Sequence, residues 1–393
     1  MKILQKSHLF SHALAAEPDR LHFAAHSHHL WPDVTRSAAD RAWLDAAERA
    51  DEKWGHVFGE VIESSKRNVA RALGVADASQ VAFSANTHDL LVRLLSALPG
   101  WNGTRPLRIL STGAEFHSFA RQMRRFVESG RVEWHQVDAE PFESLDERFR
   151  AAAGSGAWDL VFASHVLFSS GFAFDQVFEI LAGLPEETVC VVDGYHGFMA
   201  LETEFGPFAD RLYYTAGGYK YAMSGEGACF LVAPHGRELR PELTGWFAGF
   251  SSLEDEQTER VGYDAGASRF LGATLEVVPF YRFNAVWDLL DAEGLTIGDL
   301  HGHSLALQER FLDHVAAGRT GDLVLEQLVP PREIHGSHRR GCFLTFRRPD
   351  AQALHEALAA KRVITDVRGD RLRFGFGLYQ TSAGVDALVE RIG

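Results

Sequence analysis

Hydrophobic and polar positions recur along the chain with a spacing that changes from segment to segment. Between residues 42 and 73 apolar side chains follow the period of a helix, which Gly74 can terminate. Short runs rich in β-branched and aromatic residues then predict seven strands, at 81–83, 107–110, 132–137, 160–163, 189–192, 212–214 and 229–232. Helical patterns, such as the leucines at 90, 91, 94, 95 and 98, separate the runs of the first half. This alternation predicts an α/β fold with a largely parallel sheet covered by helices on both faces.

The pattern after Gly294 predicts a second, smaller unit. A long amphipathic helix at 300–315 is followed by strand, helix, strand and helix at 342–346, 351–360, 372–376 and 383–392. We expect a large domain over residues 46–290, a smaller α+β domain over 291–393, and an N-terminal segment, 1–45, that packs on the small domain. The connection 244–272 is rich in Gly, Ser and acidic residues, and long loops in compact chains usually carry function.

Composition and charge narrow the class of protein. With 393 residues, 46% hydrophobic and 23% charged, the chain can bury a large core and a smaller one, which excludes disorder. The net charge of -14 repels phosphate backbones, so nucleic acid is not expected as a partner. The three cysteines are far apart and lack CxxC spacing, which excludes a disulfide framework and a thiolate zinc site and fits the cytoplasm. Neither a signal peptide nor a membrane-spanning run is visible, so a soluble protein is expected.

Two residues are the first candidates for chemistry. Asp193 follows the buried run 189–192, and open α/β sheets bind ligands outside the carboxyl ends of their strands. The alternative role for this aspartate is the N-cap of a following helix. Lys220 stands in the segment GGYKY and is one of only six lysines among 39 basic residues. Its aromatic, uncharged surroundings would desolvate the amine, lower its pKa and make it nucleophilic, whereas the alternative is an ordinary lysine at a loop.

Asp193, Lys220 and His196 together indicate a cofactor site. An Asp at a strand end, a His three residues later and a Lys after the next strand form the arrangement used for pyridoxal phosphate. In that arrangement the lysine forms a Schiff base with the cofactor, and the aspartate keeps the ring nitrogen protonated. The histidine would support the carboxylate or the phenolic oxygen of the ring.

These residues carry a family resemblance. DGYH (193–196), followed by GGYKY (217–221) and SGEGA (224–228), resembles the fold-type I, class V aminotransferase superfamily and, within it, the kynureninases. Four further segments appear in the same order: SHVLFSSG (164–171) is similar to SHVNY-x-TG, GWFAG (245–249) to GWFGH, SRFLGAT (268–274) to RRFLCGT, and RLRFGFGLY (371–379) to LRFGF-x-PLY. The resemblance covers most of the chain. It implies a seven-stranded, mostly parallel sheet, pyridoxal phosphate as cofactor, and a homodimer that shares its active sites.

The resemblance also implies residue roles. Lys220 would bond to the cofactor, Asp193 would pair with its ring nitrogen, and His196 would lie beside the ring. Tyr219 is expected to touch the phosphate and to act as acid and base. Further cofactor contacts are expected from Ser170, Trp246 and Thr274, the last two from the loop and from the partner subunit. Arg373 matches the arginine that holds the substrate's α-carboxylate, a bidentate task suited to a guanidinium.

The cofactor phosphate and ring need further partners. The segment FSANTHDLLVRLL (83–95) gives a strand, a polar turn and a helix start, so Asn86 and Thr87 would cap a helix whose N-terminal N–H groups hold the phosphate. A plain helix cap is the alternative and is compatible with this role. Phe116 matches the side chain that stacks on the ring, with the neighbouring His117 as a competing candidate.

Several family positions differ in this chain. The family's N-terminal NSLG-type segment is HSHH here (26–29), the Asn-Tyr of SHVNY is Leu167-Phe168, and the Asp of its FPTD segment is Phe119. His28 and His29 are therefore predicted to contact a modified substrate. No carboxylate or cysteine at ligand spacing accompanies the histidines, so they are expected to line the entrance or to be exposed, and no metal site is predicted.

The expected reaction is the hydrolytic Cβ–Cγ cleavage of a β-acyl amino acid. The alternatives on the same cofactor are transamination, β-elimination and desulfuration, and the alternative without catalysis is a relative that only binds. A desulfurase would need a nucleophilic cysteine on a mobile loop. Cys342 lies instead in an apolar alternating run, which favours a buried strand residue.

Overall fold

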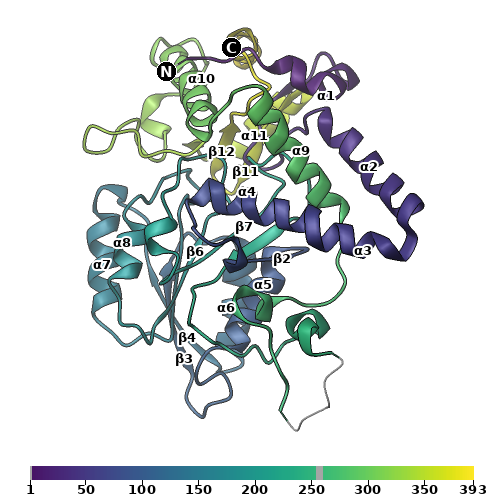
Figure 1. Cartoon of the computed structure of the whole chain (residues 1–393). Coiled ribbons are helices and arrows are strands. Elements are labelled where there is room, and N and C mark those ends of the chain that lie inside the picture. Colours follow the sequence, from purple (N-terminus) through teal and green to yellow (C-terminus); the bar gives the residue numbers. More distant parts are fainter. Residues whose placement is uncertain (1, 254–259) are drawn as a thin grey trace.

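The structure, a computed structural model, describes residues 2–253 and 260–393, and its centre is a seven-stranded sheet (Figure 1). The strand order is β2-β8-β7-β6-β5-β3-β4, in which β8 alone runs antiparallel to its neighbours. All seven strands coincide with the predicted runs: β2 (Val81–Ser84), β3 (Leu107–Thr112), β4 (Val132–Val137), β5 (Leu160–Ser164), β6 (Val189–Asp193), β7 (Tyr213–Ala216) and β8 (Cys229–Val232). The predicted α/β class with a mostly parallel sheet is confirmed.

Helices cover both faces of this sheet, as the burial of all its strands except the partly exposed edge strand β4 requires. Alternate side chains of one strand enter different cores: Leu110 lies in the core formed with α4, α7, α8 and α9, and Ile109 in the core formed with α5 and α6. The helices of this part are α4 (Glu63–Leu73), α5 (Thr87–Ser96), α6 (His117–Glu128), α7 (Leu145–Gly154), α8 (Val177–Ala182) and α9 (Val278–Ala292).

The predicted helical stripe before Gly74 is broken into pieces. The helix α2 (Val34–Arg49) ends at Ala50, whose φ of 46° cannot continue it. α3 (Lys53–His56), a π-helical turn (Val57–Ile62) and α4 then follow one another without a break. Gly74 ends α4 in the left-handed conformation, as predicted, with a φ of 67°.

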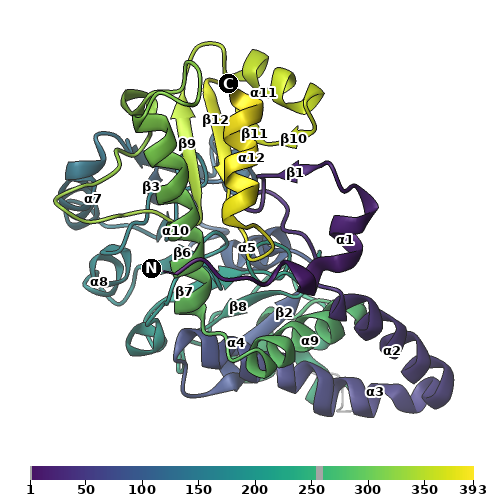
Figure 2. The ribbon, with the colours of Figure 1, turned by 90° about the horizontal axis from the view of Figure 1, so that it is seen from above.

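The C-terminal part contains a three-stranded antiparallel sheet of order β11-β12-β9, made of β9 (Phe343–Arg347), β11 (Asp366–Arg368) and β12 (Arg371–Gly375). Three helices accompany this sheet: α10 (Ile297–Ala316), α11 (Ala351–Ala360) and α12 (Ser382–Ile392). The N-terminal segment meets this part because β1 (Leu21–His22) pairs with β10 (Val363–Ile364), close to α1 (Ser11–Ala16) (Figure 2). The exact boundaries 1–45, 46–290 and 291–393 remain predictions.

The predicted loop 244–272 is only partly described, because residues 254–259 lie outside the described residues. Its described parts hold two short 3-10 helices, Trp246–Ser252 and Gly266–Phe270. Across the two described ranges of the chain, no helix has both the length and the apolar character needed to span a bilayer.

Candidate active site

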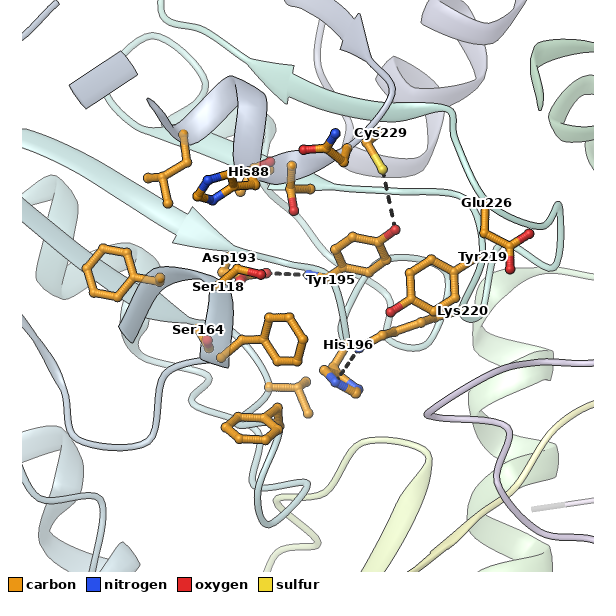
Figure 3. A pocket seen from close by; sticks show the side chains of 18 of the residues that line it. His88, Ser118, Ser164, Asp193, Tyr195, His196, Tyr219, Lys220, Glu226 and Cys229 are labelled. Atoms are coloured by element: carbon orange, nitrogen blue, oxygen red, sulfur yellow. Dashed lines mark hydrogen bonds between the residues drawn. The ribbon is translucent and has the colours of Figure 1, made fainter. Parts of the chain in front are cut away.

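A cavity of about 270 Å³ lies at the carboxyl ends of the parallel strands (Figure 3). Asp193 ends β6, Ser164 ends the neighbouring β5, and both line the cavity together with Lys220 and His196. The sheet edge therefore brings together the aspartate, histidine and lysine that the sequence singled out, in the place where open α/β sheets bind ligands.

Lys220 is buried, and its Nζ lies 2.5 Å from the Nε2 of His196. The amine also faces the rings of Tyr195, Phe116 and Tyr219, 5.1 to 5.7 Å from their centroids. Burial lowers the pKa of Lys220 to about 7, although the negative charge of Asp193 opposes this shift. A large part of the population thus carries a neutral, nucleophilic amine at neutral pH.

Asp193 lies across the cavity from the lysine. Burial raises the pKa of its carboxyl, while the backbone N–H of Tyr195, which donates to Oδ1 over 2.9 Å, and the charge of Lys220 oppose the rise. Turns and no helix follow this strand end, so the alternative role as a helix N-cap does not apply. The carboxylate is left to face the cavity, where it can pair with a protonated ring nitrogen.

Aromatic side chains form the walls of the cavity. Phe116 lines it and packs edge-on against Phe168 at 5.4 Å, whereas His117 lines a separate neighbouring cavity. The arrangement favours Phe116 over His117 as the ring-stacking candidate. Tyr219 is half-buried, and burial raises the pKa of its phenol to about 12, so it holds its proton at neutral pH. Phe119, the departure from the family's aspartate, is buried and stacks on Phe162 at 3.9 Å.

The N-terminus of α5 opens onto the same cavity. Asn86 caps this helix, its Oδ1 accepting the backbone N–H of Asp89 over 2.9 Å, and both Asn86 and Thr87 line the cavity. The first N–H groups of a helix have no partner within the helix and favour an anion. The predicted order of strand, polar turn and helix start is present, and a phosphate would find its donors here.

Gly217 allows the chain to pass close to this site. A Cβ at this position would lie 2.5 Å from both the Sγ of Cys229 and the hydroxyl oxygen of Tyr195. Those two atoms lie 3.4 Å apart and belong to residues that line the cavity. Only glycine lets the backbone pass this close to the two side chains.

Three of the predicted cofactor residues lie away from the cavity of this single chain. Ser170 is buried, and its Oγ accepts the backbone N–H of Phe172 over 3.3 Å. Trp246 is 46% exposed and packs on Phe247 at 4.1 Å. Thr274 is exposed. Their predicted cofactor contacts therefore remain predictions that require a second subunit or a rearrangement.

Arg373 is buried on β12, close to the lysine. Its guanidinium donates to the backbone oxygen of Phe168 and to Asp366, and its Cζ lies 5.7 Å from the Phe168 ring, which lines the cavity. Its positive charge contributes to the lowered pKa of Lys220. The predicted carboxylate-binding arginine thus lies behind the ring of Phe168, which separates it from the cavity.

The HSHH segment behaves differently from the expectation. His28 is half-exposed near the mouth, with its ring 6.1 Å from that of Tyr219. His29 is buried, its Nδ1–H donating to the backbone oxygen of Leu30 over 2.6 Å, and packs on Tyr379. His26 is completely buried. The expectation that all three histidines are exposed or line the entrance is therefore wrong for His26 and His29, because pairing of the N-terminal segment with the small domain buries them.

Two buried carboxyl groups near this site were not found from the sequence. Glu115 accepts hydrogen bonds from the hydroxyls of Thr112 and Ser164, both 2.5 Å long, and burial raises its pKa to about 7. Asp366 lies between Arg373 and Arg368 on the small domain. In the sequence, the position of Glu115 directly before the FHS segment was the only sign that this carboxylate lies near the site. The DVR segment that contains Asp366 carries no such sign.

Comparisons with known proteins identify relatives of this chain. Residues 300–392 match the sequence model of the kynureninase C-terminal domain family. A kynureninase of Pseudomonas fluorescens is 29% identical over 241 residues, which are 60% of this chain and 55% of that enzyme. A kynureninase of Burkholderia mallei (strain SAVP1) is 31% identical over 165 residues, 40% of this chain and 37% of that enzyme. The chain thus spans about half the length, or less, of the curated relatives it matches.

Solved structures resemble the whole chain. A mutant of C-DES with glycine covalently linked to its PLP cofactor superimposes with a TM-score of 0.77 at 17% identity, covering 99% of both chains. The apo structure of a cysteine desulfurase from Thermococcus onnurineus NA1 has the same TM-score at 18% identity, covering 99% of this chain and 97% of that one. These matches confirm the predicted fold, and the sequence matches confirm the predicted kynureninase-like resemblance.

Proposed function

We propose that this chain is a pyridoxal-phosphate-dependent, kynureninase-like hydrolase that cleaves the Cβ–Cγ bond of a β-acyl amino acid. The observation that carries the proposal is the buried Lys220, in contact with His196 and facing Asp193 across a single cavity. Water is consumed in the proposed reaction: the acyl group leaves as a carboxylate and the remainder as alanine.

The donor set fits the cofactor. The Nζ of Lys220 would hold its aldehyde carbon, Asp193 its ring nitrogen, and the N-terminus of α5 its phosphate. Pyridoxal phosphate, when bound, supplies an electron-accepting ring that stabilises negative charge at the substrate's Cα.

The residues of the chain divide the proton transfers. The neutral amine of Lys220 would take the Cα proton of the bound substrate, and its lowered pKa suits a base at neutral pH. Tyr219, whose raised pKa keeps its phenol protonated, donates to the γ-carbonyl oxygen and takes the proton back. Arg373, which lies behind the ring of Phe168, would orient the substrate through its α-carboxylate, and Phe116 and Phe168 form an aromatic wall of the cavity.

The active unit is proposed to be a cytoplasmic homodimer. Trp246 and Thr274, which match phosphate-contacting residues, lie outside the cavity of their own chain, so they would serve the site of the other subunit. The exposed aromatic side chains of Trp246 and Phe250, 5.5 Å apart, offer apolar area for such an interface.

Desulfuration through Cys342 is disfavoured by its surroundings. The thiol is buried against the backbone oxygen of Ala200, and burial raises its pKa to about 12. A thiol that stays protonated and enclosed cannot attack a sulfur atom of a substrate. Transamination remains the second candidate function, since it needs the same Lys220 and Asp193.

The test is product analysis of the pure protein loaded with pyridoxal phosphate. It is incubated separately with kynurenine, 3-hydroxykynurenine and cysteine, and with pyruvate as an amino acceptor. Alanine formed together with an aryl carboxylate supports hydrolysis. Formation of sulfide would instead indicate desulfuration, and alanine formed only when pyruvate is present would indicate transamination.

A further inference from the structure

The candidate carboxylate-binding arginine already has an anionic partner. Asp366 accepts from the Nη2 of Arg373 through Oδ2 and from the Nη1 of Arg368, 2.8 Å away, through Oδ1. Arg368 is 46% exposed, so water screens its charge, while Arg373 and Asp366 are buried. A substrate carboxylate that reaches Arg373 would thus place a second negative charge on a buried guanidinium.

His26 stands directly beside this pair. Its Nε2 lies 3.5 Å from the Oδ2 of Asp366, and its ring stacks on Phe343 at 4.4 Å. Gly375 is two residues after Arg373 on β12, so both face the same side of the strand. A Cβ on Gly375 would overlap the Nδ1 of His26, which shows that the imidazole fills the space above this glycine.

The imidazole of His26 can still form hydrogen bonds and bind a proton. His26 is completely buried, and neither ring nitrogen has a hydrogen-bond partner in the described structure. Arg373 from β12 faces it with a positive charge, as does Lys220 from the turn before β8 when its amine is protonated. His196, at 6.5 Å between ring centroids, and the negative Asp366 also face it. Burial and these cations lower the pKa of His26 to about 3, so the ring is neutral without substrate.

We propose that His26 takes up a proton when the substrate's α-carboxylate binds Arg373. The positive charge of this proton then balances the second negative charge that the carboxylate brings into the buried cluster of His26, Asp366 and Arg373. The proton comes from solvent and forms an N–H bond at Nε2, which then donates to Asp366. No bond of the substrate changes in this step. The inference rests on the proposed function, because it takes Arg373 as the site of the carboxylate.

Linkage fixes the sign of the effect. Carboxylate binding raises the pKa of His26, so affinity increases as the pH falls below the pKa of the bound state, by at most about tenfold for each pH unit. Above that pKa the affinity is low and constant. Substrates without a carboxylate would show no such dependence.

The experiment measures binding without reaction. The probe is 3-benzoylpropionate, a β-acyl carboxylate that lacks the amine, added to the protein loaded with pyridoxal phosphate. Isothermal titration in two buffers of different ionisation enthalpy gives the number of protons taken up. We expect a fractional uptake at about pH 6 that approaches zero as the pH rises.

Variants separate the cluster from its surroundings. His26→Asn should abolish both the proton uptake and the pH dependence of Kd, whereas His235→Gln, a change at an exposed histidine that also faces a carboxylate, should keep both. Asp366→Asn removes the resident negative charge. It should abolish the uptake and bind the probe more tightly than the wild type at alkaline pH, and it decides the question if His26→Asn does not fold.

A wild type that binds the probe with no proton uptake, or uptake that persists in His26→Asn or Asp366→Asn, would overturn the inference. The proposed function has a separate readout, the visible absorption band formed with pyridoxal phosphate. A protein that shows this band but no uptake keeps its proposed function and loses only the role of His26. A protein that never forms the band loses the proposed function, and the inference with it.

Discussion

Burial at single positions sets the chemistry of this site. Lys220 and Tyr219 are neighbours in the chain, yet burial moves the two pKa values apart, to about 7 and about 12. One group is therefore available as a base and the other as an acid at the same neutral pH. The sequence could predict the desolvation of the lysine from its aromatic, uncharged neighbours. It could not reveal that His196 lies 2.5 Å away, since that contact depends on how two turns meet.

The first prediction concerns that lysine. Lys220→Ala removes the only lysine among the described residues that line the cavity, so addition of pyridoxal phosphate should give no visible absorption band and the variant should have no measurable turnover. Lys361→Ala, an exposed lysine on the small domain, is the control and should behave as the wild type. The spectrum between the near-ultraviolet and the visible region is the measurement. An unchanged band in Lys220→Ala would place the covalent attachment at another lysine.

The second prediction concerns Glu115. Its pKa is raised from 4.5 to about 7 in the folded protein, so between these values the folded state keeps a proton that the unfolded chain has lost. The free energy of unfolding should therefore fall as the pH rises from about 4.5 to 7. Glu115→Gln replaces the carboxyl by an uncharged amide that can still form hydrogen bonds. It should raise the free energy of unfolding above pH 7 by up to about 3 kcal/mol.

Denaturant titrations at several pH values check this expectation, with Glu143→Gln, at an exposed position, as the control. Glu115 accepts from Ser164, which pairs in register with Asp193 on the adjacent strand. An equal pH dependence in Glu115→Gln and in the wild type would mean that this carboxyl titrates as it does in water.

At the scale of elements, periodicity predicted the strands and missed the breaks between helices. Six of the seven runs became strands that are buried on both faces, and such strands leave a continuous apolar signal; the exception is the edge strand β4, which is partly exposed. The turn at Ala50 and the π-helical turn Val57–Ile62 leave none, because the apolar stripe runs through them. The burial of His26 and His29 was missed for another reason: a histidine-rich segment looks exposed until a distant strand, β10, pairs with the segment before it.

The third prediction tests the backbone of the turn that carries Lys220. Gly217→Ala would place a methyl group 2.5 Å from the Sγ of Cys229 and the hydroxyl oxygen of Tyr195, so these two cavity-lining side chains would have to move, which should weaken pyridoxal phosphate binding by at least about tenfold. The matched control is Gly302→Ala in α10, where a Cβ meets nothing within 4 Å. That variant should bind the cofactor normally and gain up to about 1 kcal/mol of stability, since alanine favours the helix. Equal cofactor affinity in both variants would show that Cys229 and Tyr195 can move without disturbing the bound cofactor.

At the scale of the whole molecule, the proposed site is divided between two subunits. One chain supplies Lys220, Asp193 and the N-terminus of α5, while Trp246 and Thr274 lie outside its own cavity.

The fourth prediction follows from this division of the site between two subunits. A variant with Lys220→Ala and a double variant with Trp246→Ala and Thr274→Ala should each have little activity, but mixed subunits should regain it. In a mixed dimer one site carries all the changes and the other carries none, so random mixing restores about a quarter of the sites. Activity after joint refolding, compared with each variant refolded alone, is the measurement. No recovery from a mixture that sediments as a dimer would place the complete site within one chain and contradict the assignment of Trp246 and Thr274 to the partner's cofactor.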